Sequence, residues 1–322
     1  MHDRIDLPRE RADEALRIVR QHLGNSCNPT MAGRMPAKGF GGFENWLMQT
    51  EAGQVILKVP KRKEAAAGKV RNLVAALNIA AAGGIPAPEL IGSGRSDDCF
   101  DGRDYLLVRF VPGEDAEVVM PSLTEEERAG FFFELGRVIG RLHSIPIDRY
   151  SDDIGDENRR QTFHELLNDK LRRVAVRCGT KDGAGRYRIA ALIERLAERL
   201  NAMPVAFAPA VIHGDLMARN ILLRQKRFCR LLDFEHTKFF DPCCDFAKLR
   251  IEVFRPGTDD EERFFFGYAG AAALAGDAME RLDCYVGLEL IIGCTFWKFI
   301  GEHRRLREYS AALERWAETS MR

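Results

Sequence analysis

Three side chains that offer oxygen ligands stand close together in the chain, each at the edge of an apolar run. Asp215 and Asn220 lie within residues 211–223, and Asp233 follows thirteen residues after Asn220. Magnesium prefers hard oxygen ligands and keeps several of its waters, so one carboxylate and one amide oxygen from the protein suffice. A hydroxyl nucleophile needs a further oxygen that accepts its proton. These residue types at this spacing indicate a site for phosphoryl transfer.

A β-hairpin is the element that would bring these residues together. Residues 220–223 and 228–232 are short runs of strand-forming residues, separated by a charged turn. Because each strand advances roughly 3.3 Å per residue, an antiparallel return carries Asp233 back beside Asn220. Asp215 lies in the loop that feeds the first strand. The alternative is an ordinary surface hairpin with acidic ends, and the rest of the chain argues against it.

The composition excludes some classes of function. The chain has 322 residues, and its 48 Lys and Arg balance its 48 Asp and Glu, so the formal net charge is zero. Binding to a nucleic-acid backbone requires a basic excess or stripe, so nucleic acid is not expected as a partner. The length allows two lobes with sizeable cores.

The chain carries no signal for a membrane or for secretion. No apolar stretch reaches about 18 residues without a charge, so we expect no membrane span. The polar start of the chain lacks the apolar core of a signal peptide. None of the eight cysteines forms a Cys-x-x-Cys pair or a zinc-binding spacing with His. We therefore expect a cytoplasmic protein with reduced thiols.

The first part of the chain is rich in predicted strands. The chain begins with apolar residues at helical spacing, followed by a glycine-rich turn and strand-like runs. A helix that is stopped by Gly83-Gly84 comes next, and this part of the chain ends at the turn at Pro112-Gly113. The predicted helices cover 8–23 and 64–82, and the predicted strands cover 46–50, 54–59 and 105–111. This part, residues 1–112, is predicted to be the N-terminal lobe.

The remainder, residues 113–322, is predicted to be a larger and mainly helical lobe. Thr124 and Glu127 form a capping box for a helix that reaches His143. The polar residues 148–160 are typical of a mobile loop. Further helices are predicted over 164–177, 187–202, 259–275, 278–299 and 305–320. The fold class is therefore α+β, and the cleft between two such lobes is a natural nucleotide site.

A glycine-rich turn and a lysine in the N-terminal lobe suit phosphate binding. Glycines let the backbone approach phosphates closely and present its N–H groups. Lys58 alternates with apolar strand residues, so it points to the face opposite theirs, beneath the turn. A buried ammonium without a partner is costly, and a bound phosphate would provide one. A plain tight turn and an exposed edge lysine are the alternatives. The glycines are Gly39, Gly41 and Gly42.

The order of these features resembles the aminoglycoside phosphotransferase and choline kinase-like family. The motifs are the glycine turn, the strand lysine, the strand ending in Pro-Gly, Leu-His at 142–143, His-Gly-Asp-x-x-x-x-Asn at 213–220 and Asp-Phe-Glu at 233–235. They extend over roughly residues 15–300. The resemblance implies a bilobal protein-kinase-like fold and the use of ATP or GTP with Mg²⁺.

The resemblance also implies roles for single residues. Asp215 would be the catalytic base, Asn220 and Asp233 would hold magnesium, and Lys58 would grip the phosphates. His213 and Asp245 would support the catalytic loop. The hinge that meets the adenine edge would be formed by Val108, Arg109, Phe110 and Val111.

Two departures from the family pattern stand out. Relatives pair the strand lysine with a glutamate of the following helix, but residues 65–88 contain no acidic residue. Glu64 lies in the first turn of that helix, and Asn72 lies at a plausible depth but cannot form an ion pair. Met217 stands where relatives often carry a basic or histidine side chain. Arg219 offers a substitute charge, and a plain surface role is its alternative.

Acidic segments suit a cationic acceptor, and two of them are candidates for the acceptor site. The alternative for both is a solvated loop or a helix start favoured by its dipole. The first consists of Asp152, Asp153, Asp156 and Glu157, and the second of Asp259, Asp260, Glu261 and Glu262.

The main hypothesis is an ATP- and magnesium-dependent enzyme that phosphorylates a hydroxyl of a small molecule. An antibiotic or amino-sugar acceptor is favoured, with a role in resistance or self-resistance. A metabolic kinase for choline, a sugar or an amino alcohol is the alternative, and a nucleotide-binding pseudokinase is the alternative of another class. Asp-Phe-Glu in place of Asp-Phe-Gly, without an Ala-Pro-Glu segment, argues against a protein kinase. We expect a monomer or homodimer.

Overall fold

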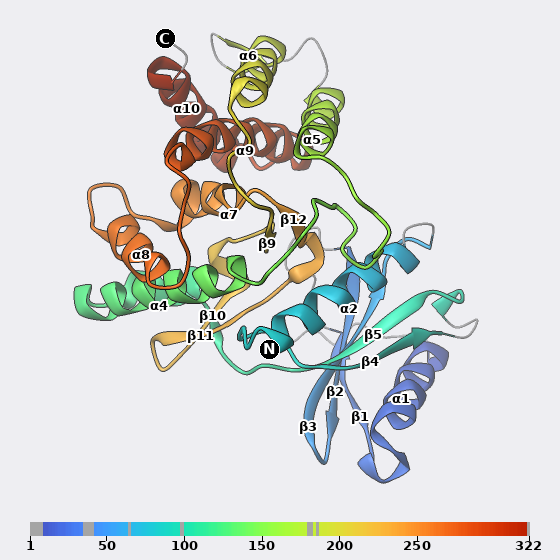
Figure 1. The fold of residues 1–322 in the computed structure, drawn as a ribbon. Helices are drawn as coiled ribbons and strands as arrows, with labels where there is room; N and C mark the ends of the chain where they lie inside the picture. Colours follow the sequence, from blue (N-terminus) through green and yellow to red (C-terminus); the bar gives the residue numbers. More distant parts are fainter. Residues whose placement is uncertain are drawn as a thin grey trace. The chain divides into compact units, whose positions relative to one another are not determined.

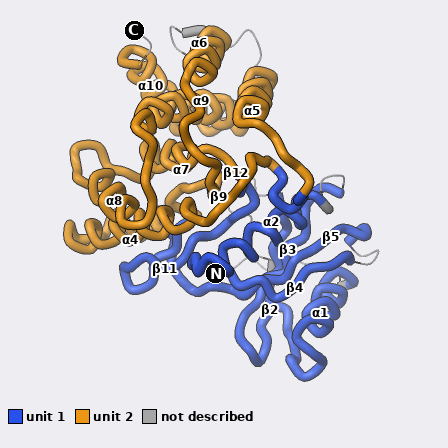
Figure 2. The backbone as a smooth tube through the Cα atoms, in the orientation of Figure 1, with its two compact units in different colours: residues 1–115, 153–157, 221–237 blue, residues 116–152, 158–220, 238–322 orange. Residues whose placement is uncertain are grey.

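The structure is a computed structural model (Figure 1), and its chain forms two compact units (Figure 2). Unit 1 comprises residues 1–115, 153–157 and 221–237, and unit 2 comprises residues 116–152, 158–220 and 238–322. The residues that the structure describes are 9–34, 42–63, 66–96, 100–178, 183–184 and 187–320.

Unit 1 contains a five-stranded antiparallel sheet with the strand order β1-β2-β3-β5-β4. The strands predicted over 46–50, 54–59 and 105–111 are confirmed as β2, β3 and β5. The sheet consists of β1 (Thr30–Arg34), β2 (Phe43–Thr50), β3 (Gly53–Pro60), β4 (Leu90–Arg95) and β5 (Asp104–Arg109).

The apolar face of β3 is the centre of the core of unit 1. Val55, Leu57 and Val59 are fully buried, and Lys58 between them is only half-buried, as the two-residue period predicts. Helix α1 (Arg9–Leu23) contributes apolar residues to the same core. Helix α2 (Ala66–Ala82) packs against β3, β4 and β5. Both predicted helices of this lobe are thus present.

A hairpin of β10 (Ile221–Arg224) and β11 (Arg227–Leu231) also belongs to unit 1. The strands are antiparallel, and Ile221 pairs with Leu231, which confirms the predicted hairpin. Both turn residues, Gln225 and Lys226, have positive φ, as a two-residue hairpin turn requires. The short strand β6 (Glu114–Asp115) pairs with the other edge of β10.

Unit 2 is mainly helical. The predicted capping box of Thr124 and Glu127 starts α4, and both of its hydrogen bonds are present. The predicted helix over 259–275 is shorter in the structure and ends at Ala269, where the chain turns at Gly270. The main helices are α4 (Glu125–His143), α5 (Phe163–Cys178), α6 (Ile189–Ala202), α7 (Cys243–Lys248), α8 (Asp260–Ala269), α9 (Ala278–Ile300) and α10 (His303–Ser320).

Residues 148–160, for which the sequence predicted a mobile loop, are tied to their surroundings. Ser151 and Phe239 exchange two backbone hydrogen bonds of 3.0 and 2.9 Å. Phe239 belongs to β12 (Lys238–Phe240), which pairs with β9 (Ala210–Ile212). The loop is therefore anchored to the small sheet that leads into the Asp215 segment.

Helices α4 and α8 approach so closely that glycine is required at their crossing. A Cβ on Gly136 would overlap the carbonyl oxygen of Phe264, and a Cβ on Gly267 would overlap that of Phe133. Arg128 donates to the carboxylate of Asp260 at the same interface, and both side chains are buried. The contact fixes α4, whose last residue His143 reaches the candidate site.

We predict that Gly136→Ala lowers the free energy of unfolding by about 1–3 kcal/mol, because the backbone of α8 must move to admit the methyl group. Gly130→Ala on the same helix is the control. Nothing lies within 4 Å of that Cβ position, so the higher helix propensity of alanine should stabilise by about 0.5–1 kcal/mol. Urea unfolding of both variants checks this. Equal effects would contradict the packing argument.

Candidate functional site

The loop between β9 and β10 folds around the carbonyl and carboxylate of Asp215. The side-chain nitrogen of Asn220 donates to the Asp215 carbonyl and to Asp215 Oδ2, both at 2.9 Å. The backbone N–H of Met217 donates to the same carbonyl at 3.0 Å. Because its nitrogen is used in this way, the amide oxygen of Asn220 is directed elsewhere, and no donor in the described part of the chain reaches it. Both side chains are buried.

Asp245 holds this loop in place from below. Its carboxylate accepts the backbone N–H groups of His213 and Gly214, each at 2.7 Å. It also lies 3.1 Å from Nε2 of His143, whose Nδ1 is 3.0 Å from the hydroxyl of Tyr268. Asp245 is 2% exposed. The carboxylate thus connects the loop to the end of α4 and to α8.

His213 is fully buried beneath the loop. Its Nδ1 accepts the backbone N–H of Asp215 at 3.3 Å. The ring therefore orients the backbone that carries Asp215, and it does not reach the surface.

Lys248, which the sequence analysis missed, forms an ion pair with Asp215. Its ammonium donates to Asp215 Oδ1. Burial alone would lower the pKa of Lys248, but the charges of Glu289 and Asp215 outweigh it, so the pKa lies above its usual value. Lys248 is consequently charged at neutral pH. The spacing was a usable signal, because Lys248 follows Asp245 by one helical turn and so lies on the same face of α7.

Glu289 and Lys170 extend this network away from the loop. Lys170 donates to Glu289 at 2.9 Å. Burial would raise the pKa of Glu289, but the charges of Lys170 and Lys248 outweigh it and lower the pKa. A carboxyl group whose pKa is lower in the folded state stabilises the fold at pH values above its pKa in the unfolded state. This stabilisation is lost as the pH falls through the pKa of the folded state. The network is therefore fully charged at neutral pH.

Arg219, considered from the sequence as the substitute cation for Met217, does not serve Asp215. Its side chain is half-buried and has no hydrogen bond or ion pair among the residues that the structure describes. The cation that reaches Asp215 is Lys248.

In unit 1, Asp233 adopts a left-handed backbone conformation with φ 63° and ψ 61°. Non-glycine residues rarely adopt it, and such strain concentrates at functional sites. Its half-buried carboxylate has no partner within the described ranges. A carboxylate held in this way is available to a ligand.

Of the lysine and glycines that the sequence predicted to bind phosphates, the structure describes Lys58 and Gly42. Gly39, Gly41 and Glu64 lie outside the described residues. The ammonium of Lys58 lies 5.1 Å from the ring centre of Phe43, the residue after Gly42. A Cβ on Gly42 would meet the ammonium of Lys69 and, at 3.0 Å, Oε2 of Glu235. The structure therefore adds a second lysine to the end of the glycine turn.

Asn72, weighed from the sequence as a partner for Lys58, is engaged elsewhere. Its oxygen accepts the backbone N–H of Ile154 at 2.8 Å, and its nitrogen donates to the carbonyl of Thr237 at 3.2 Å. The side chain therefore ties α2 to two separate segments of unit 1.

The segment 108–111 has one backbone donor to spare. The N–H of Arg109 donates to Glu89 O at 2.9 Å, and that of Phe110 donates to Gln54 O at 3.0 Å. Val108 lies inside the sheet. The N–H of Val111 has no partner among the described residues, so it is the donor of this segment that a ligand can use.

The acidic residues considered for the acceptor are largely paired with arginines. Asp152 lies 2.7 Å from Arg159, Asp153 pairs with Arg71, and Asp259 lies 2.9 Å from Arg263. In the second cluster Asp260 pairs with Arg128 and Glu261 with Arg250. Asp156 is half-buried, and Glu157 and Glu262 are exposed.

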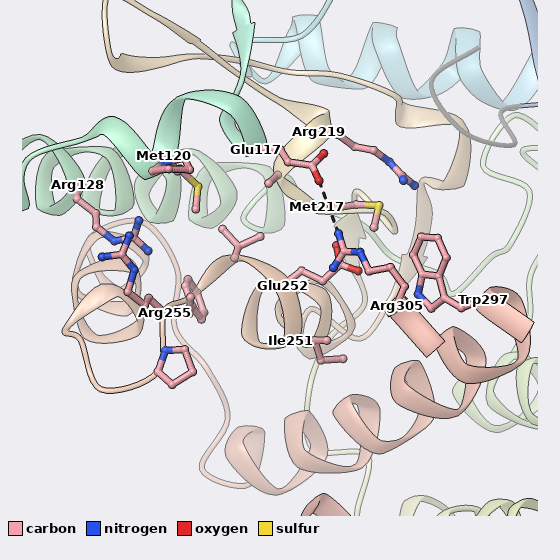
Figure 3. Close-up of a pocket in the computed structure, with 15 residues that line it drawn as sticks. Glu117, Met120, Arg128, Met217, Arg219, Ile251, Glu252, Arg255, Trp297 and Arg305 are labelled. Atoms are coloured by element: carbon pink, nitrogen blue, oxygen red, sulfur yellow. Dashed lines mark ion pairs between the residues drawn. The ribbon is translucent and has the colours of Figure 1, made fainter. Parts of the chain in front are cut away.

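A cavity of about 390 Å³ in unit 2 adjoins the Asp215 loop (Figure 3). Met217, Ala218 and Arg219 of that loop line it, together with residues 251–256 after α7 and side chains near the start of α10. None of the acidic residues considered for the acceptor lines it. Four arginines and two glutamates do.

Neither a dense metal site nor a membrane helix is found in the part of the chain that the structure describes. No group of three or more His, Cys, Asp or Glu side chains is placed to hold a metal ion. A magnesium site needs fewer protein ligands than such a group supplies. No described helix combines the length and the apolar character that a membrane span needs.

The known proteins that resemble this chain are phosphotransferases. A family model described as "Phosphotransferase enzyme family" matches residues 37–283. Among solved structures, the GDP and kanamycin complex of APH(2'')-IIIa has a TM-score of 0.67 at 14% identity, with 94% of this chain and 98% of that chain covered. The streptomycin-ATP complex of APH(2'')-IIa has a TM-score of 0.63 at 16% identity, with 90% of each chain covered.

The macrolide 2'-phosphotransferase MphH from Brachybacterium faecium has a TM-score of 0.62 at 15% identity, with 93% of this chain and 98% of that chain covered. At these identities the likeness shows the fold. It confirms the predicted α+β, protein-kinase-like fold with a strand-rich N-terminal lobe and a mainly helical second lobe.

We predict that Asp245→Asn destabilises the protein by more than about 2 kcal/mol, because an amide nitrogen would face a buried N–H donor and leave it unpaired. Asp148→Asn is the control, since Asp148 is a surface ion-pair partner of Arg160 with 72% of its side chain exposed. That change should cost less than about 1 kcal/mol. Denaturant unfolding measures both. Similar costs would show that Asp245 does not brace the loop.

Proposed function

Because the chain belongs to the phosphotransferase enzyme family, we propose that it transfers the γ-phosphoryl group of ATP or GTP to a hydroxyl of a small molecule. It is a phosphotransferase, as the sequence predicted. The observation that carries the proposal is the geometry of Asp215, whose carboxylate is held by Asn220 on one oxygen and by Lys248 on the other.

In the proposed reaction Asp215 acts on the acceptor hydroxyl. The hydroxyl oxygen attacks the γ-phosphorus, the bond from phosphorus to the β,γ-bridging oxygen breaks, and the hydroxyl proton passes to the Asp215 carboxylate. Lys248 donates to that carboxylate and orients it. Asn220 fixes the second oxygen, so the carboxylate cannot rotate freely.

Asn220 and Asp233 are the proposed magnesium ligands. The hydrogen bonds of Asn220 use its nitrogen, and neither its amide oxygen nor the carboxylate of Asp233 has a partner among the described residues. These are two hard oxygen donors, which fit the preference of magnesium. When bound, magnesium would neutralise charge on the nucleotide phosphates.

We assign nucleotide binding to unit 1. Lys58 and the glycines 39, 41 and 42 would hold the phosphates, and Lys69 would add a second cation there. The free N–H of Val111 would meet the adenine edge. The solved relatives with GDP and ATP support nucleotide use.

The acceptor is proposed only at the level of its chemical class. The names of solved relatives include kanamycin, streptomycin and a macrolide phosphotransferase, which supports an antibiotic acceptor and a resistance role. A metabolic kinase remains the second candidate, and the charge of the cavity beside the loop favours it. A pseudokinase would not need the hydrogen-bonded pair of Asp215 and Asn220.

We predict that Asp215→Asn lowers kcat by about 100- to 10,000-fold, the usual range for a lost general base, without changing the Kd for ATP. An ADP-release assay with hydroxylated acceptors and magnesium measures the first quantity, and calorimetry measures the second. Asp148→Asn should behave like the unchanged protein. Full transfer activity in Asp215→Asn would exclude its proposed role.

We predict that Lys248→Met moves the acidic limb of the pH profile of kcat/KM upward by about one unit, because the carboxylate loses its opposite charge and takes up a proton at higher pH. Lys248→Arg should restore most of the original profile. An unshifted profile in Lys248→Met, with activity merely reduced at every pH, would mean that Lys248 has only a structural role.

A further inference from the structure

The cavity beside the Asp215 loop identifies the chemical class of the acceptor, provided that the proposed kinase function holds. Residues 217–219, which line it, follow Asp215 within four positions. Residues 251–253, which also line it, follow Lys248 within five positions and lie in a π-helical turn (Leu249–Val253). π-Helical turns are frequent at functional sites. A molecule in this cavity is therefore flanked by the segments that carry both Asp215 and its lysine.

Positive charge exceeds negative charge on the cavity wall. Figure 3 shows Arg128 and Arg255 toward one end and Arg219, Arg305 and Trp297 toward the other. Against these four arginines the lining has only two carboxylates, Glu117 and Glu252.

Two of the arginines are already neutralised by protein carboxylates. Arg128 lies against Asp260, with its Nε at 2.6 Å from Oδ1. Arg305 lies 3.6 Å from Glu117, the ion pair drawn in Figure 3, and 3.7 Å from Glu308. Both of these guanidinium groups therefore serve the protein itself.

Arg219 and Arg255 are the two arginines left over. Neither side chain has a hydrogen bond or ion pair among the residues that the structure describes. Arg219 is half-buried, which makes an unpaired charge there costly. Arg255 is exposed, and its backbone is held by the Asp260 carboxylate at 2.7 Å. The two guanidinium groups lie toward opposite ends of the cavity, and each is suited to bind a carboxylate or a phosphate.

The carboxylates of the cavity do not outweigh its unpaired arginines. Glu117 is paired with Arg305. Glu252 accepts the hydroxyl of Tyr309, a neutral partner, so one acidic side chain stands against Arg219 and Arg255. A polycation would have to lie beside Arg219 and Arg255, and at 4 Å a pair of like charges costs about 4 kcal/mol near a protein surface.

We propose that the hydroxyl acceptor is anionic, with a carboxylate or a phosphate ester, and that Arg219 and Arg255 attract it from opposite ends of the cavity. The antibiotic or amino-sugar acceptor favoured from the sequence is cationic, and its charge does not match this cavity. The acceptor is instead a hydroxylated acid or a phosphorylated metabolite that keeps a free hydroxyl for transfer.

The first test compares acceptors that differ in charge. ADP release with magnesium and ATP is measured with glycerol and glycerate, with glucose, gluconate and glucose 6-phosphate, and with kanamycin. Glycerate should have a higher kcat/KM than glycerol, gluconate and glucose 6-phosphate should each have a higher kcat/KM than glucose, and kanamycin should give no stimulation. A kcat/KM for kanamycin above those of the anionic compounds would overturn the proposed acceptor class and leave the kinase function intact.

Variants assign the effect to the two arginines. Arg219→Met and Arg255→Met should each raise KM for the best anionic acceptor by about 10- to 100-fold, as expected for a lost charge-assisted contact, with KM for ATP unchanged. Arg172→Met is the matched control, because Arg172 pairs with Asp169 on α5 and its side chain is 72% exposed. Unchanged acceptor KM in both cavity variants would refute the assignment.

A second readout does not depend on turnover and separates the two proposals. The Tm of the protein saturated with ADP and magnesium is measured with citrate or with kanamycin. Citrate should raise the Tm of the unchanged protein and of Arg172→Met, but not that of the double variant Arg219→Met/Arg255→Met. Stabilisation by kanamycin instead of citrate would overturn the anion site, whereas stabilisation by citrate without any acceptor-stimulated ADP release would count against the kinase function alone.

Discussion

The buried carboxylate of Asp245 is the interaction on which the conformation of the Asp215 loop depends. It accepts two backbone N–H groups from consecutive residues, His213 and Gly214, and it meets the ring of His143. A buried charge is tolerated only where it is fully hydrogen-bonded. Asp245 meets this condition by accepting hydrogen bonds from the loop itself. The same hydrogen bonds therefore hold the loop and satisfy the buried carboxylate. Through His143 and Tyr268 the same carboxylate reaches α4 and α8, whose close approach is set by Gly136 and Gly267.

The short helix α7 carries both Asp245, which holds the loop, and Lys248, which contacts the carboxylate of Asp215. One turn after Asp245, Lys248 reaches Asp215 and provides the positive charge that Met217 cannot supply. The chain then continues through the π-helical turn that lines the arginine-rich cavity. Loop position, carboxylate charge and the wall of the proposed acceptor site are therefore set by one continuous stretch of about fifteen residues. In the proposed reaction, a change in one part of this stretch would therefore affect the loop position, the carboxylate and the cavity wall together.

Features that depend on neighbouring residues could be predicted well. The β10–β11 hairpin, the capping box of α4 and the alternation of Lys58 with buried valines and leucine all follow from local spacing, and the structure contains them. The shorter α8 and the anchoring of residues 148–160 were missed, because a turn at Gly270 and pairing with Phe239 are tertiary features. The same holds for Asn72, whose side chain is used by Ile154 and Thr237 rather than by Lys58.

The sequence by itself determined the reaction class, because residue types at short spacing, Asp215 with Asn220 and then Asp233, limit which chemistry a loop and hairpin can support. Only the tertiary structure decided which charges remain available. Lys248 reaches Asp215 across 33 positions, and Arg71 neutralises Asp153 across 82. Acidic clusters that seem free in the sequence are thus largely taken up by arginines, while Arg219 and Arg255 are left unpaired among the described residues. Charge pairing depends on distance in space, and that distance is set by packing rather than by position in the chain.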